Sequence, residues 1–93
     1  MTRMAPWSNT RISTSTTTAV KASAGILHSV VVCTKGTAAS VVTVYDNPSA
    51  ASGTVLAVID SLNQVGTYTF DLQATTGITV VTTGAPDIVV LYK

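Results

Sequence analysis

The fold is indicated most strongly by Gly25 to Asp60, GILHSVVVCTKGTAASVVTVYDNPSAASGTVLAVID. It contains three short runs that are rich in β-branched residues, at 26–34, 40–46 and 54–60. The segments between them hold Lys-Gly and then Asp-Asn-Pro with Ser, Ala and Gly, which are residues that form turns and interrupt strands. The stretch therefore predicts successive β-strands, and it carries no catalytic or ligand-binding motif.

Strand patterns also flank this stretch. Turn-forming residues recur about every ten residues, and no helical periodicity is present on either side. We therefore predict one all-β domain, a β-sandwich of about seven strands of immunoglobulin-like or jelly-roll type, over residues 17–93. The strands that we predict outside the first stretch are 17–22, 67–73, 78–82 and 87–92.

The predicted strands differ in how their apolar residues are spaced. Residues 67–73 alternate, which places Tyr68, Phe70 and Leu72 toward a core. Other strands have aliphatic residues in succession and so carry them on both faces. Because no helix is predicted to cover these strands, the outer face of at least one sheet must meet another copy of the chain or a larger partner. The successive aliphatic runs are Val30-Val31-Val32, Val41-Val42, Val80-Val81 and Val89-Val90-Leu91.

Composition excludes several classes of partner. Charged residues make up 10% of the chain, against about 25% in ordinary soluble domains. The cations are too dispersed for a nucleic-acid footprint, and no apolar run approaches the roughly 20 residues of a membrane span. The N-terminus lacks the apolar core of a signal peptide. We therefore expect a product of the cytoplasm with no nucleic-acid or membrane partner.

Residues 1–16, MTRMAPWSNTRISTST, have no sustained period and are rich in Ser, Thr and Asn. We predict that they form an extended arm. The arm carries the single tryptophan of the chain, Trp7, beside Pro6 and between Arg3 and Arg11. Trp and Arg are enriched at interface hot spots, so these four residues are the predicted contact with another subunit. The alternative is that Trp7 folds back on its own sheet.

Residue types that carry catalysis or bind metals are sparse. The chain has one histidine, one cysteine and four aspartates but no glutamate. His28 and Cys33 lie five residues apart on one predicted strand, which would place them on opposite faces. We predict that Cys33 is a small buried hydrophobe and that His28 is partly buried, or else forms a symmetric cluster between copies. The sequence thus predicts no enzyme, no metal site and no cofactor.

Three segments, GILHSVVVCTKG, TVYDNPSAASGTVLAVID and IVVLYK, resemble small virion proteins of tailed bacteriophages, of the head decoration (cement) or fibre-associated kind. The resemblance spans Gly25 to Lys93. It rests on the glycines, among them Gly53, and on the corner Tyr45-Asp46-Asn47. It implies a β-sandwich or jelly-roll unit that assembles, often as a trimer, on the outside of a capsid.

From this resemblance and the two-faced strands we expect a structural virion protein. It would be a homo-oligomer, a trimer, that decorates the capsid surface and stabilises the phage head by binding between major capsid subunits. The arm would contact the shell or a sister subunit through Arg3, Pro6, Trp7 and Arg11. The alternative is a tail-fibre or host-surface glycan-binding module, which calls for exposed aromatic and polar side chains gathered at one end. A small hydrolase would need a catalytic triad, and the sequence does not indicate which Ser or Thr partners would join the single histidine.

Overall fold

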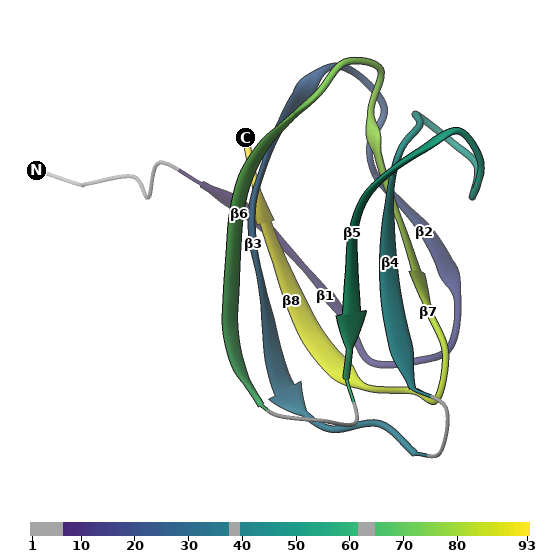
Figure 1. Cartoon of the computed structure of the whole chain (residues 1–93), viewed down its shortest axis with the longest axis vertical. Helices are drawn as coiled ribbons and strands as arrows, with labels where there is room; N and C mark the ends of the chain where they lie inside the picture. The colour runs from purple at the N-terminus through teal and green to yellow at the C-terminus, as the bar shows by residue number, and fades with distance from the viewer. Residues whose placement is uncertain (1–6, 38–39, 62–64) are drawn as a thin grey trace, which may run out of the picture.

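The structure, a computed structural model, describes residues 7–37, 40–61 and 65–93. These residues form eight strands and no helix, and the strands make two four-stranded antiparallel sheets that face each other (Figure 1). The predicted all-β sandwich is therefore confirmed. In chain order the strands are β1 (Ser8–Ile12), β2 (Thr17–Lys21), β3 (Gly25–Thr34), β4 (Val41–Asp46), β5 (Thr54–Asp60), β6 (Gly66–Ala74), β7 (Ile78–Thr82) and β8 (Asp87–Tyr92).

The strand pairing is that of one long hairpin that has been rolled up. β1 pairs with β8, β2 with β7, β3 with β6 and β4 with β5, each pair antiparallel. Pairing of β3 with β8 and of β4 with β7 joins these into sheets of order β1-β8-β3-β6 and β2-β7-β4-β5. Eight strands paired in this way have the topology of a jelly roll.

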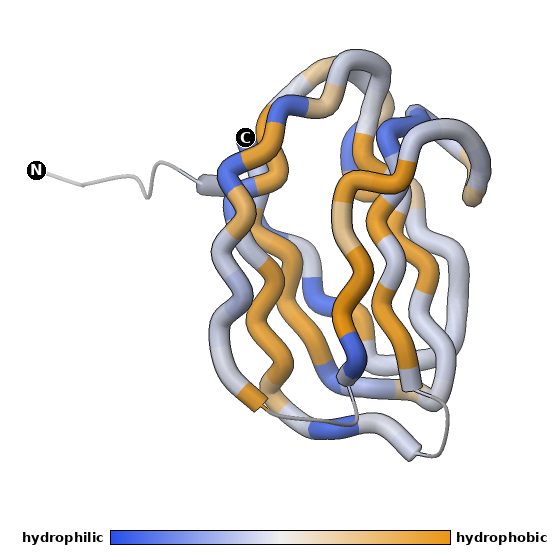
Figure 2. The backbone as a smooth tube through the Cα atoms, viewed as in Figure 1, coloured by the Kyte–Doolittle hydropathy of each residue, from blue (hydrophilic) through white to orange (hydrophobic). Residues whose placement is uncertain are grey.

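The core lies between the sheets and is almost entirely aliphatic. Hydrophobic residues run along the facing strands of both sheets (Figure 2). Polar side chains that enter the interior are paired, as in the 2.5 Å contact between Ser40 Oγ and Ser61 Oγ. The largest apolar side chains with no solvent exposure are Leu27, Ile78, Ile88, Val30, Val42, Val44, Val80 and Val90.

The eighth strand, β1, lies within the segment that we predicted to be an arm. Its backbone pairs with β8 from Ser8 opposite Tyr92 to Ile12 opposite Ile88. Ile12 is its one buried side chain, while its other residues are polar. An edge strand of this kind leaves no apolar alternation in the sequence, which is why we predicted seven strands. The extended arm of residues 1–16 is therefore not confirmed.

A β-bulge interrupts the pairing of β3 with β6. His28 lies opposite two residues, Phe70 and Asp71. Asp71 has a φ of 51°, in the left-handed region that Asp and Asn enter more readily than most residues. The pairs that flank this bulge are Leu27 with Leu72 and Ser29 with Thr69.

The alternation that we read along residues 67–73 continues through the bulge. Tyr68 and Phe70 are half-buried and pack against the core, as predicted. Leu72 lies opposite the buried Leu27 and two residues before the buried Ala74, which places it on the same row as Tyr68 and Phe70. Its side chain is nevertheless 36% exposed, because β6 is an edge strand.

Cys33 is exposed, so the prediction that it is a buried hydrophobe is wrong. Val30 and Val32 point inward, and Cys33 faces outward where the pairing of β3 with β8 shifts register. His28 is also an extra residue of β3 relative to β8, between the pairs Leu27–Tyr92 and Ser29–Leu91, and this undoes the parity argument that placed His28 and Cys33 on opposite faces. Five residues of strand, at about 3.3 Å each, still hold the two side chains too far apart to share a ligand.

Asp46, at the end of β4, fixes the turn that carries the chain from β6 in one sheet to β7 in the other. Its carboxylate accepts hydrogen bonds from the backbone N–H groups of Thr75, at 3.0 Å, and Thr76, at 2.9 Å. The two threonine hydroxyls donate to the same carboxylate at 2.7 and 2.9 Å. These bonds favour the ionised form, so they hold the pKa of Asp46 well below its usual range, with the N–H of Thr75 as the largest cause.

Because the pKa of Asp46 is lower in the folded chain than its ordinary value of 3.8, its stabilisation is complete above that value and is lost as the pH falls through the folded pKa. We predict that Asp46→Asn lowers the melting temperature at pH 7, since an amide NH2 would then face backbone N–H donors. The difference from the wild type should shrink as the pH falls below about 4. Thermal unfolding between pH 7 and pH 2 measures both effects.

Asp71→Asn makes the same change outside this turn and is the matched control, for which we expect a smaller loss at pH 7. Equal melting temperatures for the wild type and Asp46→Asn at pH 7 would contradict the role given to this carboxylate.

Candidate functional site

Three chemically distinctive side chains meet at the bulge on the outer side of the sheet β1-β8-β3-β6. His28 Nδ1 lies 2.5 Å from Asp71 Oδ1. An ionised carboxylate can only accept hydrogen bonds, so the imidazole donates through Nδ1–H. The indole of Trp7 stacks on the imidazole, with ring centroids 4.1 Å apart and planes 3° from parallel. We call Trp7, His28 and Asp71 the bulge site.

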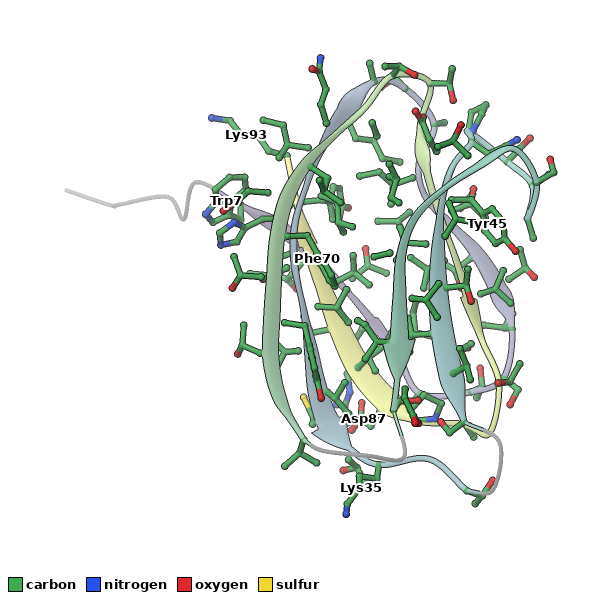
Figure 3. All side chains as sticks on the ribbon, in the orientation of Figure 1. Trp7, Lys35, Tyr45, Phe70, Asp87 and Lys93 are labelled. Carbon is green, nitrogen blue, oxygen red and sulfur yellow. The ribbon has the colours of Figure 1, made fainter. Side chains whose placement is uncertain are left out.

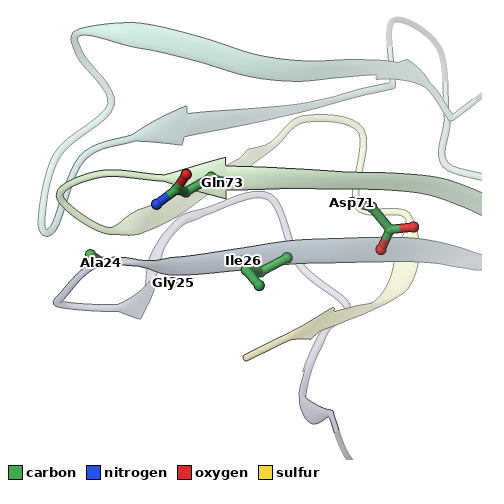
Figure 4. Close-up of a pocket in the computed structure, with 5 residues that line it drawn as sticks. All are labelled: Ala24, Gly25, Ile26, Asp71 and Gln73. Atoms are coloured by element: carbon green, nitrogen blue, oxygen red, sulfur yellow. The ribbon is translucent and has the colours of Figure 1, made fainter.

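A pocket of about 490 Å³ adjoins the bulge site (Figure 4). Asp71 belongs to both. The pocket lies between β3, where the exposed side chain of Ile26 offers an apolar surface, and β6, which supplies carboxylate and amide groups. Its lining residues are Ala24, Gly25, Ile26, Asp71 and Gln73.

Because residue 25 is a glycine, the chain segments at Lys21, Gly25 and Lys93 can approach one another closely beside this pocket. A Cβ at Gly25 would lie 2.3 Å from the carbonyl oxygen of Lys93 and 2.6 Å from Cε of Lys21. The backbones of Ile26 and Lys93 exchange two hydrogen bonds, of 2.8 and 2.9 Å. The pocket is therefore bordered by fixed backbone, and a side chain at position 25 would have to displace it.

Of the four residues that the sequence grouped as one contact, the structure describes Trp7 and Arg11 and gives them different partners. Trp7 stacks on its own chain, which is the alternative that the sequence left open, and lies at the same end of the sheet as Lys93 (Figure 3). Arg11 forms a two-point ion pair with Asp87, with Nε–Oδ1 at 2.8 Å and NH2–Oδ2 at 2.5 Å. Arg3 and Pro6 lie outside the described residues.

The Arg11–Asp87 pair ties the edge strand β1 to β8. The hydrogen bonds from the guanidinium lower the pKa of the Asp87 carboxyl, and the same contact raises the pKa of Arg11. The Arg11 side chain is 68% exposed, so water screens this pair and its contribution is small. Arg11 thus has a partner within its own sheet.

Sequence reasoning missed Asp71 and Gln73. Both were read as outward polar residues of an alternating strand, which is their commonest role. The position of Asp71 beside His28, and of Gln73 opposite Ile26, depends on the register of β3 with β6 and on the bulge, neither of which is written in local sequence. The one signal in the sequence was Asp71, a carboxylate that directly follows the aromatic residue Phe70 in the middle of a predicted strand.

The described residues offer little for metal or membrane chemistry. Among residues 7–37, 40–61 and 65–93, no three His, Cys, Asp or Glu side chains gather closely enough to hold a metal ion. In the same residues there is no helix with the length and apolar character needed to cross a membrane.

Apolar side chains also cover the outer faces of both sheets. On the sheet β2-β7-β4-β5, Val58 is 63% and Val55 48% exposed, and both lie on the edge strand β5. Val58 and Val81 both pair with Thr43, so they occupy one row across the sheet. On the other sheet Val31 lies opposite Val89. We call Val41, Val55, Val58 and Val81 the outer valine patch.

Comparison of the chain with protein-family models, with curated proteins and with solved structures gave no match.

His28→Ala removes the ring on which Trp7 stacks. Since Trp7 is the single tryptophan, its fluorescence reports on this contact. We expect emission at longer wavelength, stronger quenching by acrylamide, and a free energy of unfolding lower by about 1 kcal/mol, the size of an aromatic pair.

Thr67→Ala, at an exposed position of β6, is the control and should leave the emission unchanged. An emission spectrum that is the same in His28→Ala and the wild type would show that the stack does not form in solution.

Proposed function

We propose that this protein is a structural virion protein, a capsid decoration (cement) protein that acts as a homo-oligomer, a trimer, between major capsid subunits. The observation that carries the proposal is the outer valine patch on the sheet β2-β7-β4-β5.

The outer valine patch lies where a second chain has access to it. The edge strand β5, Thr54–Asp60, has one charged residue, and its outward side chains include Val55 and Val58. Fully burying one such side chain contributes about 1.5–3 kcal/mol. Long apolar edge strands invite pairing with another chain, so natural proteins charge, shorten or cover them. A sister copy or the shell supplies that cover in our proposal.

The fold and the resemblance support the same class. Jelly rolls recur in viral capsid proteins, although they also serve lectins and enzymes, so the topology supports the proposal only by analogy. The segments that resemble phage virion proteins include β3, β5 and β8. A decoration protein needs no catalytic group. It binds by avidity, since several linked copies hold a shell far more tightly than one.

Val58→Lys places a cation in the middle of the outer valine patch at a position that the folded chain leaves exposed. We expect sedimentation velocity to show a multimer for the wild type and, for this variant, at least about tenfold weaker association, equal to a loss of about 1.4 kcal/mol. Cosedimentation with phage heads that lack a decoration protein tests shell binding, which should fall in parallel.

Thr67→Lys adds the same charge at an exposed position of the other sheet and should associate like the wild type. Equal association of the wild type and Val58→Lys would refute the role of the outer valine patch. A multimer that does not sediment with heads would leave self-association standing and remove the capsid function.

A further inference from the structure

We propose that the pocket beside the bulge site binds a neutral saccharide, with one sugar ring seated between Ile26, Asp71 and Gln73. This inference is independent of the capsid proposal, because the pocket lies on the sheet β1-β8-β3-β6 and the outer valine patch lies on the other sheet.

The lining groups match the two kinds of surface that a sugar presents. The hydroxyl groups of a sugar donate and accept hydrogen bonds, and its C–H face is apolar. Asp71 is an acceptor whose side chain is 59% exposed, and only its Oδ1 contacts His28 Nδ1. The amide of Gln73 donates and accepts. Ile26, 38% exposed, offers an apolar surface for the C–H face.

The acceptor is held in place before a ligand arrives. Asp71 is fixed through its backbone by the bulge and through Oδ1 by His28. His28 is held in turn by the stacked indole of Trp7. A group that is ordered in advance loses less conformational entropy on binding, which improves affinity. Packing of the sandwich does not require the His28–Asp71 contact, whereas positioning of an acceptor for a ligand does.

The charges and the aromatic contact favour a neutral ligand. Asp71 is the one charged residue among the five that line the pocket, so an anion is disfavoured. The stem of Lys21 packs against Gly25, which places a cation near the same pocket. One face of Trp7 is taken by His28, so the site lacks the open aromatic cage that an organic cation uses. The volume of about 490 Å³ is within the range of small-molecule sites.

The experiment is a titration of ¹⁵N-labelled full-length protein with glucose, galactose, mannose and N-acetylglucosamine, each to about 50 mM because single sugars bind with millimolar affinity when few contacts are made. Choline chloride and sodium acetate are the cationic and anionic probes. We expect at least one sugar to shift the indole N–H signal of Trp7 and the side-chain amide of Gln73. Neither ion should do so beyond the effect of equal sodium chloride.

Asp71→Asn keeps a side chain that accepts the left-handed backbone and can still accept from His28, but it loses the charged acceptor. We expect at least about tenfold weaker sugar binding, the usual loss for a hydrogen bond to a charged group. Gln73→Ala, at an exposed position, should also weaken binding and does not depend on the bulge. Asp60→Asn makes the same change as Asp71→Asn on the other sheet and should bind as the wild type does.

The proposal is overturned if no sugar shifts these signals at the highest concentration. It is equally overturned if choline or acetate binds in preference to every sugar, or if Asp71→Asn and Gln73→Ala bind as tightly as the wild type.

Discussion

The antiparallel pairing of β4 with β5 is the contact on which the rest of the roll depends. These strands are joined by the shortest connection between paired strands, and Asn47 closes it by accepting hydrogen bonds from the N–H groups of Ser49 and Ala50. Once this pair is in register, β3 meets β6, β2 meets β7 and β1 meets β8, each at greater separation along the chain. Asp46 then holds the β6–β7 turn against the end of β4.

Much of this fold could be predicted because most strands are marked in the local sequence. The strands β5, β7 and β8 have the bounds that the β-branched runs indicate, and the other strands from β2 onward differ by one residue at one or both ends. The strand β1 could not be predicted, since its outward side chains are polar and its one buried residue is Ile12. The position of Cys33 could not be predicted either, because a register shift between β3 and β8 sets it.

The candidate site was less predictable than the fold. Trp7 stood out by composition, and in the described structure its indole stacks on His28 of the same chain. His28 and Asp71 are 43 residues apart and meet only because β3 pairs with β6 at a bulge. The sequence analysis thus singled out Trp7 and His28 but did not pair them, and it singled out no residue as part of the pocket. Local sequence patterns predict where strands lie, whereas the residues that meet on the surface of a sheet depend on the register in which the strands pair.

In our proposal, sister chains cover the outer valine patch of this jelly roll. The native mass of the unmodified protein, measured by light scattering coupled to size exclusion over a micromolar dilution series, tests this directly. We expect a multimer, in particular a trimer, that persists on dilution. A monomer at every concentration would contradict it and would mean that the exposed valines of β5 serve no contact between copies.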